Sequence, residues 1–303
     1  MTAAGLAAVR EIARDIKLSH SVFALPFALL GALVALPPGP IDRGRLALSA
    51  TLVVGCMVAA RTAAMVANRL LDQHIDARNP RTAGRALPAG RVGARAARLA
   101  LFVSSLAFVA FAALFGVLQG NWWPAALSVP VLGWICAYGL CKRFTMLCHV
   151  WLGTSLAMSP AAAALAVRPE SLAGSAPWLL SAAVLCWVAG FDVLYAMQDV
   201  EVDRRDGLHS MPARLGETGA AWVARLLHAA CVLLLLGFRE SDPAFGTAFV
   251  AAVWIAAAVI AFEHVVLATR GAGGFARHFT LLNGIVSLVI GGVGIASVAG
   301  SRG

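Results

Sequence analysis

The sequence is poor in charged residues. Only 13% of its 303 residues are Asp, Glu, Lys or Arg, whereas 60% are hydrophobic and the mean hydropathy is +0.81. Soluble domains carry about 25% charged residues, so this composition excludes an ordinary water-soluble globule. It predicts an all-α, polytopic membrane protein that lies in a lipid bilayer.

Several familiar sequence patterns are missing. The six cysteines form no C-x-x-C pair, and the seven histidines show no H-E-x-x-H spacing, so neither zinc nor haem is indicated. The cysteines fall in or beside apolar segments, which indicates reduced, buried packing residues. A D-G-x-x-A-R signature is also absent, which argues against a CDP-alcohol phosphotransferase.

Apolar segments long enough to span a bilayer recur along the chain. A spanning helix needs roughly 20 mostly apolar residues, and the segments of about that length are Leu18–Leu36, Leu46–Ala67, Ala94–Gly116, Trp122–Leu140, Leu147–Val167, Trp178–Met197, Gly219–Phe238, Thr247–Thr269 and Phe279–Ala299. The connections are short. We therefore predict one integral-membrane domain over residues 1–303, with nine transmembrane helices in a single bundle.

Basic residues are distributed unevenly between the loops. They gather in the N-terminal arm and in the loops after the even-numbered segments, above all after the second segment, where they are Arg69, Arg78, Arg81, Arg85, Arg91, Arg95 and Arg98. The positive-inside rule then places the N-terminus and these loops in the cytoplasm, with the protein integral to the cell (inner or plasma) membrane. The net charge of +9 is explained by topology and by a possible anionic substrate, so no nucleic-acid partner is expected. The sequence identifies no protein partner.

A polar stripe ends the second apolar segment, in the string VANRLLDQHIDARNP. Asn68, Asp72 and Asp76 follow one another at intervals of four, which places them on one face of a helix. Carboxylates at the end of a spanning helix are costly unless they are paired or liganded, so they indicate function. We call these three residues the first stripe.

A second stripe follows the sixth apolar segment, in FDVLYAMQDVEVDRRDGLHSMPARLG. Asp192, Tyr195, Asp199 and Asp203 again share one helical face, and a basic loop containing Gly and Pro follows, as it does after the first stripe. Mg²⁺ prefers oxygen ligands and shares substrate phosphates, so two facing stripes with nearby arginines predict a metal–diphosphate site. In the alternative interpretation the acids only pair with neighbouring arginines. A single D-x-x-x-D favours that alternative, whereas two matching stripes favour the metal site.

The two stripes resemble the paired acidic motifs of UbiA-type intramembrane prenyltransferases. A third string, YGLCKRF (residues 138–144), is similar to the Y-x-x-x-K(R) motif of that family, and the number of segments and the side of the motif loops also agree. The resemblance implies a reaction in which Mg²⁺ binds a polyprenyl diphosphate, the allylic C–O bond ionises, and an aromatic acid acceptor is prenylated in quinone biosynthesis.

The resemblance also implies a role for each motif residue. The metal ligands would be Asn68, Asp72, Asp76, Asp199 and Asp203. The substrate-binding residues would be Arg81, Arg85, Tyr138, Lys142, Arg143, Asp192, Tyr195 and Arg214. Asp72, Asp199 and Lys142 would be the residues that matter most for catalysis. Tyr138 could instead be an interfacial belt tyrosine, and Asp192 could contact the acceptor or pair with a basic residue.

One position departs from the family pattern, and the acceptor stays open. Arg69 stands where the family's N-D-x-x-D-x-x-x-D motif has its second residue, an acid, so one carboxylate is lost from the first stripe. The strings around both stripes look closest to the menaquinone branch that proceeds through futalosine, with the 4-hydroxybenzoate branch of ubiquinone synthesis also open. Haem farnesylation is a further possibility within the family, and a membrane transporter with a polar site in its helix bundle is the alternative outside it.

Overall fold

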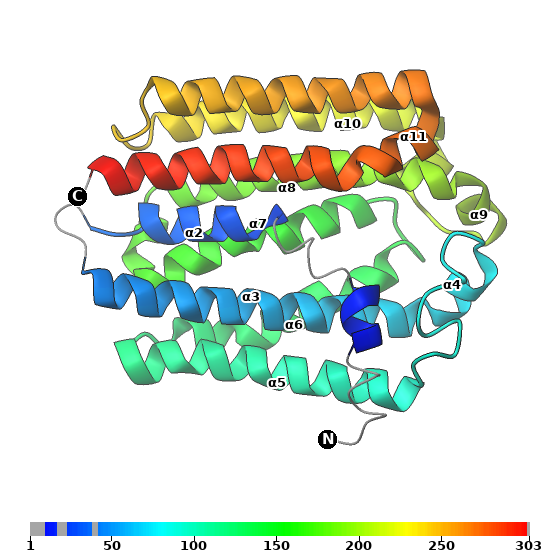
Figure 1. Cartoon of the computed structure of the whole chain (residues 1–303), viewed down its shortest axis with the longest axis horizontal. Helices are drawn as coiled ribbons and strands as arrows, with labels where there is room; N and C mark the ends of the chain where they lie inside the picture. Colours follow the sequence, from blue (N-terminus) through cyan, green and yellow to red (C-terminus); the bar gives the residue numbers. More distant parts are fainter. Residues whose placement is uncertain (1–9, 17–22, 38–41, 302–303) are drawn as a thin grey trace.

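Helices make up the regular structure of this chain. The computed structural model describes residues 10–16, 23–37 and 42–301, and within these ranges every regular element is a helix (Figure 1). A short helix at residues 10–15 precedes α2. The remaining elements are α2 (Leu25–Val34), α3 (Arg43–Leu71), α4 (Gln73–Arg78), α5 (Ala94–Gln119), α6 (Trp123–Cys141), α7 (Cys148–Val167), η2 (Pro169–Ala173), α8 (Ala176–Ala196), η3 (Met197–Asp199), α9 (Val200–Arg205), α10 (Met211–Arg239) and α11 (Thr247–Ser301). The all-α prediction is confirmed.

Seven helices of the described chain are long and apolar enough to cross a membrane. The last of them, α11, has 55 residues and is interrupted at Gly271, whose φ of 66° lets the chain reverse, so its two arms run side by side in opposite directions (Figure 1). The helix α2 has only ten residues, and the first part of the predicted span Leu18–Leu36 lies outside the described residues. Nine spans in one domain therefore stays a prediction.

The helix α8 lies at the centre of the bundle, packed against both α7 and α10. Its Trp187 and Phe191 form an aromatic cluster with Phe23, which precedes α2, and with Phe279 of α11. Small residues let the helices approach closely. A Cβ atom at Gly153 of α7, for example, would lie 2.7 Å from a backbone oxygen of α8.

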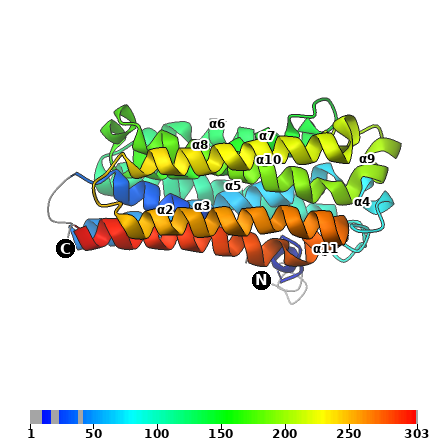
Figure 2. The same cartoon turned by 90° about the horizontal axis from the view of Figure 1, so that it is seen from above.

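Both acidic stripes lie at one end of the bundle, where α4 and α9 project from it (Figures 1 and 2). The spacing predicts that each stripe lies on one regular helix, but neither stripe does. Asp72 separates α3 from α4, although Asp72 N–H still donates to Asn68 O at 2.9 Å, and Asp76 N–H to Asp72 O at 2.7 Å. The second stripe runs from α8 through the 3₁₀ turn η3 into α9. Such tight turns bend the chain at the ends of long helices, and here they carry Asp72 and Asp199 out of the helical repeat.

Candidate active site

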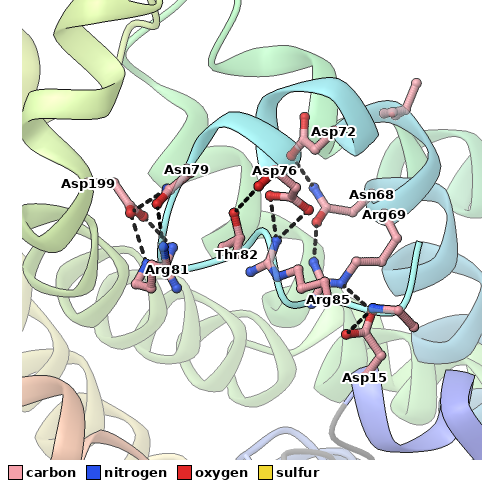
Figure 3. Close-up of polar contacts among 12 residues, drawn as sticks. Asp15, Asn68, Arg69, Asp72, Asp76, Asn79, Arg81, Thr82, Arg85 and Asp199 are labelled. Carbon is pink, nitrogen blue, oxygen red and sulfur yellow. Dashed lines mark hydrogen bonds and ion pairs between the residues drawn. The ribbon is translucent and has the colours of Figure 1, made fainter. Parts of the chain in front are cut away.

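The first stripe is buried and held by polar contacts. Asp72 and Asp76 are 3% and 4% exposed, and Asn68 Nδ2 donates to Asp72 Oδ2 at 3.1 Å. Arg85, nine residues after Asp76, places Nη1 2.8 and 2.7 Å from the two Asp76 carboxylate oxygens (Figure 3). The hydroxyl of Thr82 donates to the Asp76 carbonyl at 3.0 Å, which folds the following loop back over the stripe.

That same loop reaches the second stripe. Asn79 Nδ2 and Arg81 Nε each donate to Asp199 Oδ1 at 2.9 Å, and Arg81 Nη2 also donates to Asp199 Oδ2 (Figure 3). Burial lowers the pKa of Arg81, but the hydrogen bonds and charge of Asp199 outweigh burial and leave that pKa raised. The Arg81 guanidinium also lies 5.6 Å from the centre of the Tyr195 ring. The two stripes therefore lie close together, as the sequence predicts.

The third motif joins them at the end of α6. Lys142 Nζ lies 3.6 Å from Asp72 Oδ2, and Arg143 Nη2 lies 3.6 Å from Asp72 Oδ1 and donates to the Leu71 carbonyl at 2.5 Å. Lys142 also interacts electrostatically with Asp199 and with Asp203. Gly139 lets α6 approach α3, since a Cβ atom there would lie 3.0 Å from Asn68 Nδ2. Lys142 thus contacts the first stripe and interacts electrostatically with the second.

The other predicted residues occupy the edges of this site. Asp192 lies 2.7 Å from His149 Nδ1, so it pairs with a histidine rather than with an arginine or lysine. Asp203 is 6% exposed, so it is buried at the edge of the site. Tyr138, one turn before Lys142, lies close enough to interact electrostatically with Asp192 and Asp72. Arg214 is exposed and contacts His209, and among the residues that the structure describes it forms no ion pair with an acid of either stripe.

Three residues of this site carry no signal in the sequence. Asn79 binds Asp199 across 120 residues, and His149 binds Asp192 while its Nε2 accepts from the Met211 N–H at 3.2 Å. Asp15 accepts from Arg69 Nε at 3.1 Å. None of the three lies in a stripe.

Arg69 replaces an acid but does not point at the other carboxylates of the first stripe. Its Nε donates to Asp15, and its Nη1 donates to Asn68 Oδ1 at 3.0 Å (Figure 3). Asn68 therefore turns its amide nitrogen towards Asp72 and its oxygen towards Arg69. The positive charge of Arg69 is matched by a carboxylate from the N-terminal segment, on the far side of Asn68.

The residues of the site fit a divalent cation in the kind of atoms they offer. Carboxylate and amide oxygens are the ligands that Mg²⁺ prefers, and Asp72 Oδ1 is buried without a hydrogen-bond donor. Among the residues that the structure describes, no three acidic, histidine or cysteine side chains are grouped closely enough to hold a metal ion, because basic side chains lie between them. Two ion pairs of the site join segments that are far apart in the sequence, namely Asp199 with Arg81 and Asp72 with Lys142. The alternative in which each acid only pairs with a neighbouring arginine does not explain these two long-range pairs.

Known proteins with similar sequences identify the family of this chain. The UbiA prenyltransferase family model matches residues 24–295. A protein named 4-hydroxybenzoate octaprenyltransferase from Xanthomonas campestris pv. campestris (strain B100) is 37% identical over 243 residues, which cover 78% of this chain and 75% of that protein. Its namesake from Xanthomonas euvesicatoria pv. vesicatoria (strain 85-10) is 34% identical over 245 residues, covering 79% of this chain and 76% of that protein.

Solved structures show the same fold. The apo structure of a UbiA homolog from Aeropyrum pernix K1 has a TM-score of 0.78 at 33% sequence identity, covering 91% of this chain and 97% of that one. A UbiA homolog from Archaeoglobus fulgidus, bound to DMAPP and Mg²⁺, has a TM-score of 0.64 at 16% identity, covering 95% of this chain and 99% of that one. The predicted fold and enzyme class are confirmed: the chain is a multi-pass membrane prenyltransferase, and it belongs to the UbiA prenyltransferase family.

Proposed function

We propose that this prenyltransferase transfers a polyprenyl group from polyprenyl diphosphate to an aromatic acid in quinone biosynthesis, with Mg²⁺ as cofactor. The observation that carries the proposal is the position of Lys142, which lies 3.6 Å from Asp72 of the first stripe and interacts with Asp199 and Asp203 of the second. The positive charge of Lys142 could bind the phosphate groups of a ligand, while the acidic stripes on either side bind its metal ion. The family membership argues against the transporter alternative.

The basic residues would bind the diphosphate. Arg81, Arg85, Lys142 and Arg143 all contact stripe carboxylates, so their charged groups lie where phosphate oxygens could replace those carboxylates. Charge-assisted contacts of this kind hold phosphate strongly, and arginine can hold it through two parallel hydrogen bonds. Arg214 would bind phosphate only from the periphery, since it is exposed and contacts His209.

The acidic residues would hold Mg²⁺. The proposed ligands, direct or through water, are Asn68, Asp72, Asp76, Asp199 and Asp203. When bound, the metal would neutralise the diphosphate and favour its departure as the allylic C–O bond breaks. A carbon of the aromatic acceptor then bonds to the allylic carbon and loses its ring proton. Tyr195, with the Arg81 guanidinium over its ring, and Tyr138 would line the path of the allylic cation.

The acceptor is proposed to be an aromatic acid of the 4-hydroxybenzoate kind. Support comes from the two Xanthomonas relatives, which are named for 4-hydroxybenzoate. The Archaeoglobus homolog solved with DMAPP and Mg²⁺ supports only the prenyl donor and the metal. The stripe sequences themselves look closest to the menaquinone branch through futalosine, so its bicyclic aromatic acid is the second candidate. Asp192, held by the buried His149, is the residue we place against the acceptor.

The test is direct. Purified protein in detergent or lipid would be incubated with Mg²⁺, a radiolabelled polyprenyl diphosphate and, in parallel, 4-hydroxybenzoate, a bicyclic aromatic acid or haem. We expect a prenylated aromatic acid that disappears when EDTA is added. Label transferred only to haem would instead establish the farnesylation alternative, and full turnover in EDTA would contradict the metal assignment.

The orientation is also part of the proposal. Basic residues gather in the loops at the stripe end of the bundle, so we place that end and the N-terminus in the cytoplasm. A cysteine introduced at Arg98, beside the first stripe's loop, should react with a membrane-impermeant thiol reagent only after the cells are lysed.

A further inference from the structure

A polar cavity lies at the end of the bundle opposite the two stripes. It has a volume of about 660 Å³ and forms where α3 and α6 begin and where α5 and α7 end. Its polar lining comes from Arg45, Gln119, Asn121, Arg168 and Glu170. Arg45 and Asp72 lie on the same helix or at its end, so at 1.5 Å per residue they are about 40 Å apart. We call it the far-end cavity, and the proposed reaction does not use it.

Hydrogen bonds between helices hold the walls of the far-end cavity in place. Gln119 Nε2 donates to the Ser49 hydroxyl at 2.9 Å, which joins α5 to α3. Asn121 Nδ2 donates to the carbonyls of Leu165 and Ala166 at 2.8 and 2.9 Å, which joins the α5–α6 turn to the end of α7. Gly120, with φ of 76°, allows that turn. The cavity is therefore a built feature and not a gap between loose loops.

Two tryptophans at its rim face the membrane interface. Trp122 and Trp123 are 58% and 57% exposed, at the level where α6 begins. The Trp122 ring rests on α5 at Gly116, where a Cβ atom would come within 2.4 Å of the indole, so this exposed ring has a fixed place. Tryptophan rings favour the level of lipid headgroups, where one part of the ring is in contact with water and the rest with hydrocarbon.

The charges of the far-end cavity lack protein partners. Among the described side chains, none of Arg45, Arg168 and Glu170 forms an ion pair. Arg168 Nε is buried and has no hydrogen-bond acceptor. The guanidinium groups of Arg45 and Arg168 line the cavity without a carboxylate partner among the described residues, so they are available to an anionic ligand. This end of the bundle has few basic residues, yet two of them line one cavity.

We propose that the far-end cavity binds the headgroup of an anionic phospholipid from the adjacent leaflet. Arg45 and Arg168 would donate to the phosphodiester, and Trp122 and Trp123 would lie beside the glycerol and the start of the acyl chains. Two arginines and one glutamate leave a single positive charge in the cavity, which balances the single negative charge of one phosphodiester. The ligand class is thus a phospholipid with one net negative charge.

The experiment measures lipid retention by native mass spectrometry. Wild-type protein in detergent is titrated with phosphatidylglycerol, and the variant Arg45→Gln/Arg168→Gln is compared with the matched control Arg43→Gln/Arg239→Gln. The control removes two arginines from the same end but outside the cavity, where Arg43 is exposed and Arg239 pairs with Glu240. We expect one tightly held lipid in the wild type and in the control. The cavity variant should bind it about tenfold more weakly for each arginine lost.

Further measurements separate the possible outcomes. Prenyl-transfer activity shows that each variant is folded, and the single variant Arg168→Gln serves if the double variant is not. Diacylglycerol, which lacks phosphate, should not be retained, and inorganic phosphate at the lipid's own concentration should not displace the lipid. Equal retention of diacylglycerol, displacement by inorganic phosphate, or equal losses in the cavity variant and the control would each overturn the proposal.

Discussion

Arg81 and Asp199 form an ion pair that joins the loop after the first stripe to the second stripe, although 118 residues separate them in the sequence. Asn79 supports the pair by donating to the same carboxylate at 2.9 Å. The carboxylate of one proposed metal ligand is therefore held by a proposed phosphate-binding residue. In the proposed function, substrate binding would exchange this contact for new ones to phosphate and metal.

Replacing Arg81 should impair diphosphate use. Arg81→Ala removes a charge-assisted contact of about 1.5–3 kcal/mol, so kcat/KM for the polyprenyl diphosphate should fall roughly 10- to 100-fold. Initial rates against diphosphate concentration provide the measurement. Arg78→Gln is the control, because Arg78 lies in the same region but is exposed and pairs with Asp206, outside both stripes, at 3.5 Å. Similar losses of kcat/KM in both variants would mean that Arg81 does not bind the diphosphate.

Lys142→Gln should insert into the membrane normally and turn over poorly. The lysine contacts Asp72 and interacts with Asp199 and Asp203, so its loss removes a charge between the stripes. We expect kcat/KM to fall roughly 10- to 100-fold. Arg98→Gln, an exposed residue outside both stripes, should stay near wild type. If the two variants have equal activity, Lys142 acts only in topology.

Neutral replacements of the central acids should remove metal-dependent activity. Asp72→Asn and Asp199→Asn keep the side-chain shape and remove one charge each, so both should lose at least about 100-fold in kcat while remaining in the membrane. Titration of turnover with Mg²⁺ is the measurement. A wild-type response to Mg²⁺ in either variant would rule that residue out as a ligand.

The pair of Arg69 and Asp15 should show strong coupling in stability. Their side chains are only 9% and 12% exposed, so Arg69→Met leaves a nearly buried carboxylate without its partner, at a cost of about 3–5 kcal/mol. Adding Asp15→Asn removes that charge and should recover much of the loss. Thermal unfolding of the two single variants and the double variant tests this, and additive losses would contradict the coupling.

Two glycines should respond in opposite ways to alanine. A Cβ atom at Gly31 of α2 would lie 2.4 Å from the backbone oxygen of Pro160 in α7, so Gly31→Ala should destabilise the bundle by about 1–3 kcal/mol. At Gly292 of α11 a Cβ atom meets nothing within 4 Å, so Gly292→Ala should be neutral or stabilise by about 0.5–1 kcal/mol. The melting temperatures in one detergent compare the two, and an equal shift would show that this helix contact is loose.

Spacing, the basic loops after both stripes and the resemblance to the family together predict which segments meet in the site. Asn68, Asp72 and Asp76 were identified because a period of four is the helical repeat, and the α3–α4 junction keeps their backbone hydrogen bonds despite the break at Asp72. The ion pair between Asp199 and Arg81 cannot be predicted from the sequence, because the arginines nearest to Asp199 in the sequence are Arg204 and Arg205. Partners more than 100 residues apart are selected by how the helices pack, which local patterns do not encode.

Other contacts escaped the sequence for a related reason. His149 shows no motif, yet it is 3% exposed and binds both Asp192 and the backbone of Met211. The break in α11 falls in the connection between the predicted spans Thr247–Thr269 and Phe279–Ala299, so the sequence locates it, but the sequence does not identify Gly271, with its φ of 66°, as the residue that makes the turn. Long apolar segments reveal themselves by composition, whereas single polar partners and turns depend on the assembled bundle.

The ion pairs between the stripes have a consequence for biogenesis. Asp72, Asp76 and Asp199 each have a basic partner supplied by the same chain, so their charges are compensated at the membrane edge without any ligand. The catalytic end of the nascent protein should therefore be able to assemble before any ligand binds. In the proposed function, cells short of magnesium or of isoprenoid should then accumulate an intact, idle enzyme instead of degrading it, ready to resume turnover when either returns.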